Sequence, residues 1–192
     1  MNEENKPNYL QQTSENFIPI NVPQPQQKVE LSAAIRSHID QWILRYPPEH
    51  KRSGVFEALR VVQEENGGFL TPPLMDAVAD YLGMTAISVY EIAAFYTMYH
   101  LNPVGQHVID VCTNISCELN GAEEILTHFK KRLHINLNET TSDGQFTLRE
   151  VECLGACVAP PVCQIGKKFY ENLTAEKVDE MLEMLSASKK AK

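Results

Sequence analysis

The sequence predicts an α+β protein in two parts, a small bundle of helices followed by an α/β unit with a small mixed sheet. Apolar residues recur at helical spacing from residue 29 to about residue 99. From residue 107 onward, short apolar runs typical of strands alternate with helical stretches and turn residues. We therefore expect a helical bundle domain over residues 29–103 and an α/β domain over residues 104–187. A disordered tail is expected at 1–28, which is rich in Asn, Gln and Pro, and a C-terminal tail at 188–192.

The ends of the first two of four expected helices are predicted by proline and glycine residues that break a helix. One begins near Val29 and stops before Pro47, because proline cannot continue a helix. The second would be capped by Ser53 and would end at "NGG", residues 66–68, since glycine reaches left-handed backbone angles. These two segments account for the first half of the bundle.

The third and fourth helices carry their own start signals. Thr71 before a proline pair predicts the start of the third helix, and Gly83 predicts its end. Ser88 and Glu91 have the spacing of a capping box, so the fourth helix is expected to run from Val89 toward Tyr99. Together the four helices make the predicted bundle.

In the second part of the chain, the spacing of the apolar residues changes from purely helical to a mixture of strand and helix patterns. "HVIDV" reads as a strand, "GAEEILTHFKKRL" as a helix, and "FTLREVE", "VCQIG" and "KKFY" as further strands. Thr174 can cap a last helix with Val178, Met181, Leu182 and Leu185 inward. A strand, a helix, further strands and a helix predict an α/β domain with a mixed sheet.

Composition excludes several classes of function. The formal net charge of −8 and the pI near 5.3 argue against nucleic acid or an anionic membrane as the main partner, because both require a basic surface. The sequence contains no apolar run approaching the roughly 18 residues of a membrane helix and no secretory leader pattern. We expect a cytosolic chain with no direct membrane insertion.

All five cysteines lie in the second part. Cys112 and Cys117 stand in "VCTNISCELNG", where a predicted strand gives way to polar residues. Cys153, Cys157 and Cys163 stand in "ECLGACVAPPVC". In a cytosolic chain such a set indicates a metal or redox site rather than structural disulfides.

Spacing alone leaves several kinds of site open. Structural zinc accepts four thiolates with similar spacings, and a dithiol enzyme would require a C-x-x-C pair, which is absent. An iron–sulfur cluster also takes four thiolates and occupies more room, which favours the wider C-x4-C and C-x3-C loops. A Rieske centre would need two histidines, and only His107 is near a cysteine pair. Cys163 lies in a short apolar strand, and we expect it to be a buried core residue and not a ligand.

At this point the sequence resembles a known family. "VCTNISCELNGAEEIL", "DGQFTLREVECLGAC" and "APPV", with "YPPEHKRSGVFEALRVVQEENGGFL" and "VADYLGMTAISVYEIAAFYTMYHL", are similar to the small flavoprotein-fragment subunits of respiratory complex I, the NADH:quinone oxidoreductase. The likeness extends over residues 30–187. It implies a helical bundle followed by a thioredoxin-like domain that binds one [2Fe-2S] cluster, with these ligands: Cys112, Cys117, Cys153 and Cys157.

The resemblance also implies a function. The chain would be an electron-transfer subunit that holds its cluster close to the FMN of a larger, NADH-oxidising subunit, without catalytic residues of its own. The chain has no G-x-G-x-x-G or G-x-x-x-x-G-K-[ST] pattern, so FMN and NADH would be supplied by that partner. Other peripheral-arm subunits would attach it to the inner membrane from the cytoplasm. The alternatives are the equivalent subunit of an NAD-linked hydrogenase or formate dehydrogenase, or a non-redox interaction module with structural zinc.

Some positions depart from the family pattern. The family often has Ala where Gly54 stands, Pro at Glu57 and Thr at Ala94, which we expect to affect helix packing and not the cluster. After Cys157 the family usually reads Gly-Asp-Ala-Pro or Val-Asn-Ala-Pro, whereas this chain has "VAPPV". The backbone of that loop is therefore expected to differ locally.

Overall fold

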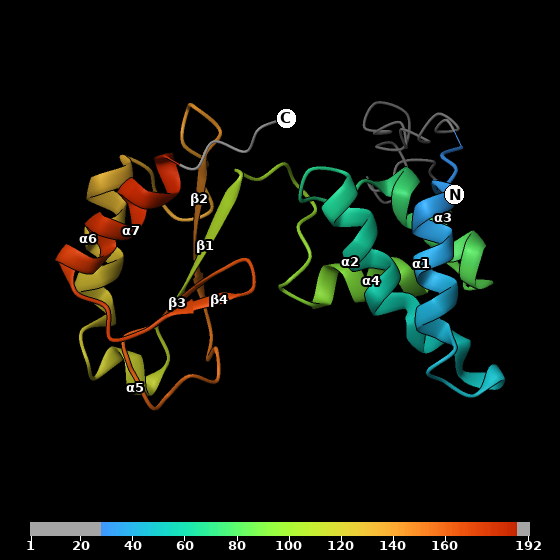
Figure 1. The fold of residues 1–192 in the computed structure, drawn as a ribbon, viewed down its shortest axis with the longest axis horizontal. Helices are drawn as coiled ribbons and strands as arrows, with labels where there is room; N and C mark the ends of the chain where they lie inside the picture. The colour runs from blue at the N-terminus through green and yellow to red at the C-terminus, as the bar shows by residue number, and fades with distance from the viewer. Residues whose placement is uncertain (1–27, 188–192) are drawn as a thin grey trace, which may run out of the picture.

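The computed structural model of this 192-residue chain describes residues 28–187. The predicted tails lie outside the described residues, apart from Lys28, whose ammonium pairs with the Asp80 carboxylate at 3.1 Å. Figure 1 shows a body of helices and a body of strands and helices, joined by one stretch of chain. None of the helices within residues 28–187 is long and apolar enough to cross a membrane.

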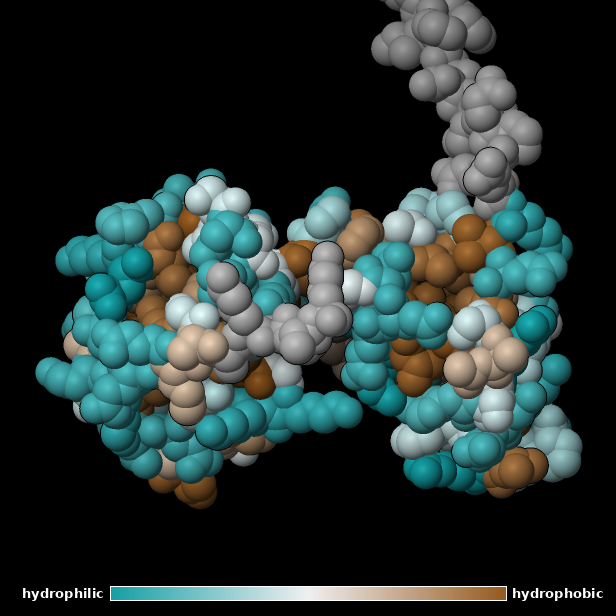
Figure 2. Space-filling view, turned by 45° about the horizontal axis from the view of Figure 1, so that its top comes forward, coloured by the Kyte–Doolittle hydropathy of each residue, from teal (hydrophilic) through white to brown (hydrophobic). Residues whose placement is uncertain are grey.

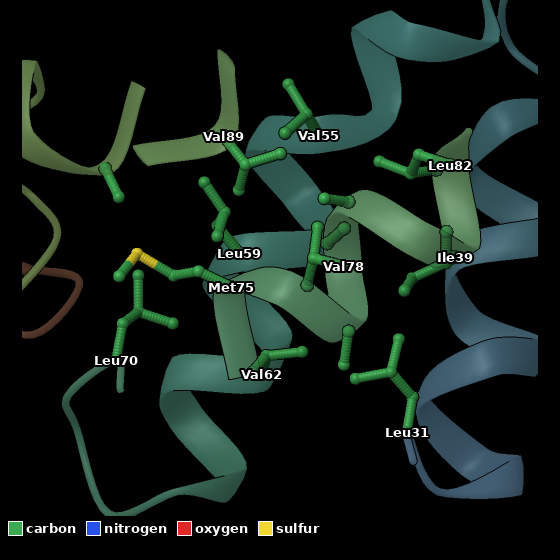
Figure 3. Close-up of a cluster of buried hydrophobic side chains, with 14 of the residues drawn as sticks. Leu31, Ile39, Val55, Leu59, Val62, Leu70, Met75, Val78, Leu82 and Val89 are labelled. Carbon is green, nitrogen blue, oxygen red and sulfur yellow. The ribbon is translucent and has the colours of Figure 1, made fainter. Parts of the chain in front are cut away.

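The helical body contains four α-helices and one 3₁₀ segment. Their bounds are α1 (Ala33–Ile43), η2 (Pro48–Gly54), α2 (Val55–Glu65), α3 (Pro72–Leu82) and α4 (Ala86–Phe95). Their apolar faces meet in one core, and Figure 3 shows side chains from all four α-helices and the connecting segments pointing toward one another. The most deeply buried of them include Ile39, Leu59, Val62, Leu70, Val78, Leu82 and Val89. The predicted bundle of four helices is confirmed.

The starts of three helices differ from prediction. α1 begins after Ser32 and not near Val29, because the Ser32 hydroxyl accepts a hydrogen bond from the Ile35 amide at 3.2 Å. Ser53 does not cap α2, since it lies inside η2 and α2 follows without a side-chain cap. Proline at the start of η2 supplies the helical φ angle, so the chain is already coiled when it reaches Ser53.

The fourth helix begins one turn earlier than predicted and ends earlier as well. The Thr85 hydroxyl accepts a hydrogen bond from the Ser88 amide at 3.4 Å, so Ser88 lies in the first turn of α4 and is not its cap. The last helical residue is Phe95, because Tyr96 has extended backbone angles (φ −85°, ψ 117°). The stop of α3 is as predicted, with Gly83 in the left-handed region at φ 65°.

The family departures in this body have specific surroundings. A Cβ added to Gly54 would meet the Ile43 side chain at 2.9 Å, so the departure permits close packing there. Glu57 is buried and contacts Arg60 and His38. Ala94 is exposed, so the expectation that this position affects helix packing is wrong.

The second body is a four-stranded mixed sheet with helices. Its elements are β1 (His107–Cys112), α5 (Ile115–Glu118), α6 (Ala122–Leu133), β2 (Phe146–Val151), β3 (Cys163–Ile165), β4 (Lys168–Tyr170) and α7 (Ala175–Ala187). The strand order is β2-β1-β3-β4, in which β1 and β2 are parallel and the other neighbours are antiparallel. The predicted strands and the mixed sheet are confirmed.

Two helices cover this sheet. α6 and α7 pack against each other, and Figure 1 places both on the same side of the strands. The Thr174 hydroxyl accepts a hydrogen bond from the Lys177 amide at 3.3 Å, as expected of the α7 cap. The core between helices and sheet includes Ile109, Val111, Phe129, Leu148, Cys163 and Val178, and it is separate from the core of the helical body.

The two bodies are joined by residues 101–104. In Figure 2 they form two rounded masses with a gap between them. The extensive packing contacts between helices and strands all stay within one body or the other. Division into two domains near residue 103 remains a prediction, which these two cores support.

Candidate functional site

Parallel pairing of β1 with β2 brings two cysteine-bearing loops to one end of the sheet. β1 ends at Cys112, whose partner in the register is Val151, the last residue of β2. Cys153 follows two positions later. Since parallel strands end at the same edge, both loops leave the sheet together. Figure 1 places α5 and the loop after β2 at this end.

The first loop holds Cys112 and Cys117 in apolar surroundings. Both side chains are buried, each 3% exposed, in a small cluster with Ala122 and Val162. Asn114 begins α5, its side-chain oxygen accepting from the Ile115 amide at 3.0 Å, and this turn directs Cys117 back toward Cys112. Burial, followed by the hydrogen bond with the Cys112 thiol, raises the pKa of Cys117 to about 11.

The second loop holds Cys153 and Cys157 at the surface. Their Sγ atoms are 3.4 Å apart, and both side chains are exposed. Gly155, at φ 80°, turns the backbone so that its amide donates to Cys153 Sγ at 3.4 Å. This N–H group, followed by the contact with Cys157, lowers the pKa of Cys153, while hydrogen bonding with Cys153 raises the pKa of Cys157.

Polar side chains hold the two loops together. Thr113 Oγ1 donates to Glu150 at 2.8 Å, and Asn114 Nδ2 donates to Glu152 at 2.7 Å. Each bond joins a residue of the first loop to a residue at the end of β2 or just beyond it.

Sequence reasoning missed these positioning residues and the helix α5. An asparagine between two cysteines is a signal for a helix cap, but a four-residue helix is too short to show a period. Which carboxylate meets Asn114 depends on pairing between distant strands, and no local pattern reveals it.

The remaining candidate residues lie elsewhere. Cys163 is fully buried in β3 opposite Val111, inside the main core of the sheet body, and burial raises its pKa to about 12. His107 stands at the opposite end of β1 from Cys112. Among residues 28–187, no three His, Cys, Asp or Glu side chains stand close enough together to hold a single metal ion.

The "VAPPV" loop after Cys157 is held by backbone contacts. The Ala159 amide donates to Ala156 O at 3.2 Å, and the Pro160–Pro161 bond is cis. Val158 is 93% exposed. In the first loop, Ile115 is 73% exposed and Leu119 is 81% exposed. We call these three residues the apolar rim, since all belong to the cysteine-bearing loops.

The fold and the site define a class of protein in which a helical bundle is followed by a small mixed sheet with four thiols at one edge. Comparison with known proteins gives the family. Residues 39–186 match the model of the thioredoxin-like [2Fe-2S] ferredoxins. The chain belongs to this family, and the expected thioredoxin-like sheet domain is confirmed.

Known relatives extend over most of the chain. It is 44% identical over 146 residues to the E subunit of NADH-quinone oxidoreductase from Rickettsia conorii, covering 76% of this chain and 87% of that protein. It is 42% identical over 156 residues to the E 2 subunit of NADH-quinone oxidoreductase from Rhizobium meliloti, covering 81% of this chain and 91% of that protein. These identities confirm the resemblance inferred from the motifs.

A solved structure shares the fold. The chain superimposes on a chain of an NAD+-reducing [NiFe]-hydrogenase in the H2-reduced state with a TM-score of 0.59 and 15% identity. The match covers 68% of this chain and only 22% of that chain. At this identity the likeness is one of fold.

Proposed function

We propose that this chain is an electron-transfer subunit of NADH:quinone oxidoreductase, in which Cys112, Cys117, Cys153 and Cys157 hold one [2Fe-2S] cluster. The observation that carries the proposal is the meeting of two cysteine pairs at one end of the sheet, on loops that follow parallel strands. Membership of the [2Fe-2S] family and the 44% identity to the Rickettsia conorii protein support the same assignment.

The donor set fits such a cluster. A four-thiolate [2Fe-2S] cluster takes two protein sulfurs at each iron. Thiolates bound tetrahedrally at about 2.3 Å lie about 3.8 Å apart, and the Sγ atoms of Cys153 and Cys157 are 3.4 Å apart. Cys112 and Cys117 form the second pair, buried together in one small apolar cluster. When bound, such a cluster accepts and releases one electron at a time.

The surroundings divide the site into an inner and an outer side. Cys112 and Cys117 are buried among apolar residues, whereas Cys153 and Cys157 face the surface beside the apolar rim. Exposed apolar side chains on the loops of a functional site are typical of a surface that a partner covers. We assign that surface to the larger FMN- and NADH-binding subunit, because electrons must enter the site at its exposed side. We also place the chain in the peripheral arm on the cytoplasmic side, as the resemblance of its motifs implies.

The cofactor is tested by analysis of the purified full-length chain. We expect iron and acid-labile sulfide in equal amounts, together with a visible charge-transfer spectrum. A colourless protein that contains zinc and no sulfide would support the interaction module with structural zinc instead.

The host complex requires a second experiment, in which the chain is affinity-purified from its native cells and its partners are identified by mass spectrometry. We expect a flavin-containing, NADH-oxidising subunit of NADH:quinone oxidoreductase. Recovery of hydrogenase or formate dehydrogenase subunits would assign the chain to one of those complexes instead. For the hydrogenase, the TM-score of 0.59 supplies a fold likeness only.

A further inference from the structure

The end of the helical body is firmly attached to its bundle. The buried Gln63 side chain on α2 donates to Met98 O at 3.0 Å and accepts from the His100 amide at 2.7 Å. His100 O accepts from the Leu70 amide at 2.7 Å. Residues 97–100 therefore move with the helices.

The sheet body begins equally firmly a few residues later. The Gly105 amide donates to the Thr147 hydroxyl at 2.6 Å, and a Cβ at Gly105 would meet the Phe146 backbone at 2.8 Å. The Gln106 amide also donates into this body. Only residues 101–104 connect the two anchored ends, and we call this segment the hinge.

The Arg149 side chain crosses from the sheet body to the helical body. Arg149, on β2, places one guanidinium nitrogen 2.9 Å from His100 Nδ1 and donates with the other terminal nitrogen to Thr97 O at 2.8 Å. Its Nε lies 3.5 Å from Asp110 Oδ1 on the neighbouring strand, where the register sets Asp110 opposite Arg149. A single guanidinium therefore contacts both bodies.

The charges on both sides suit this arrangement. Burial, and then the neighbouring guanidinium, lowers the pKa of His100 to about 4, so the imidazole is neutral at pH 7 and Nδ1 can accept from Arg149. Asp110 Oδ1 is buried without a hydrogen bond, which leaves the guanidinium as the group that compensates its charge. Arg149 is itself only 15% exposed, so water screens these contacts weakly.

We propose that Arg149 is a clamp that fixes the helical body to the sheet body across the hinge. Asp110 fixes the guanidinium on the sheet, and Thr97 and His100 receive it on the helical side. The clamp lies on the two strands that lead to Cys112 and Cys153, so it sets how the helical body is oriented relative to the cysteine-bearing edge. This role does not depend on the bound cofactor.

The decisive variant is Arg149→Lys in the full-length protein. Lysine keeps a positive charge beside Asp110 but lacks the planar fork that reaches two acceptors in the other body. Limited chymotrypsin cleavage after Leu101, which is 45% exposed in the hinge, measures opening. We expect cleavage about tenfold faster than in the wild type, as loss of one charge-assisted hydrogen bond implies. X-ray scattering should show a larger radius of gyration.

Two further variants distinguish loss of the clamp from a general loss of stability. Arg132→Lys alters an arginine whose Nε contacts Asp179 at 2.7 Å between α6 and α7, within one body, and it should leave hinge cleavage unchanged. Arg149→Met with Asp110→Asn removes both charges of the buried pair, and its cleavage should remain fast although the sheet body is not left with an unpaired carboxylate. Wild-type cleavage rates and scattering curves in Arg149→Lys or in the double variant would overturn the proposal.

Discussion

Glu57 is a carboxylate inside the apolar core of the helical body. Its side chain is 7% exposed. The Arg60 guanidinium, whose Nε lies 2.7 Å away, compensates its charge, and His38 Nε2 makes a hydrogen bond with it, also at 2.7 Å. Hydrogen bonding to Arg60, acting against burial, lowers the pKa of Glu57 from 4.5 to about 2. The departure from the family's usual proline thus introduces a hydrogen-bond network between α1 and α2.

This shift predicts how acid affects the helical body. The folded protein holds the Glu57 proton less tightly than the unfolded chain, so the contribution is complete above pH 4.5 and is lost as pH falls toward 2. Urea unfolding followed by Trp42 fluorescence measures the free energy of unfolding. Glu57 should contribute about 2 kcal/mol less to this free energy at pH 3 than at pH 6. The Glu57→Gln variant should lack this part of the pH dependence of stability.

Glu64→Gln is the matched control for Glu57. Glu64 contacts the same arginine, but its side chain is 55% exposed, so its loss should cost about 0.5 kcal/mol or less and preserve the acid dependence. Equal pH dependence in Glu57→Gln and wild type would contradict the assignment to Glu57.

Cys163 provides a second prediction at the residue scale. It is fully buried in the sheet core and lies outside the cysteine-bearing loops. Cys163→Ala should keep iron content and spectrum and cost about 1 kcal/mol in the free energy of unfolding, because the cavity is small. Cys157→Ala is the comparison and should lose the cluster. The reverse pattern would mean that the second pair of ligands is wrongly assigned.

At the scale of elements, periodicity predicted which segments are helices and strands, but not where each helix starts. The start signal of the fourth helix is visible in the sequence, whereas the choice between two hydroxyls one turn apart, Thr85 and Ser88, depends on which one reaches a free amide. The four-residue helix α5 shows no period at all. The cysteine set could be predicted from spacing and likeness, but the hydrogen bond from Asn114 to Glu152 and the reach of Arg149 across the hinge depend on tertiary pairing.

The start of α4 can be tested directly. Thr85→Ala should destabilise the helical body by about 1 kcal/mol, because it removes the side-chain acceptor at the helix N-terminus. Ser88→Ala, within the first turn, should cost less than about half as much. Urea unfolding followed by Trp42 fluorescence measures both. A larger loss in Ser88→Ala would restore Ser88 as the cap.

At the scale of the whole molecule, two separate cores are connected by a short hinge and one clamp. A chain that starts at Pro103 retains the sheet, α6, α7 and all four proposed ligands. We expect it to fold and keep its cluster, while binding the larger subunit more weakly because the helical body is missing. Circular dichroism, iron analysis and a binding titration measure these outcomes. An insoluble fragment without iron after anaerobic reconstitution would contradict the division into two domains.

The central claim is that two cysteine pairs at one end of the sheet hold a [2Fe-2S] cluster. Its most direct test is iron content together with the reduced-state EPR spectrum of full-length Cys117→Ser, with Cys163→Ala as the control. A hydroxyl is a poorer ligand than a thiolate for this iron site, so Cys117→Ser should lose the cluster or change its spectrum, and the ligand loops should be less stable. The control should match the wild type. Full iron content and an unchanged spectrum in Cys117→Ser would contradict the assigned site.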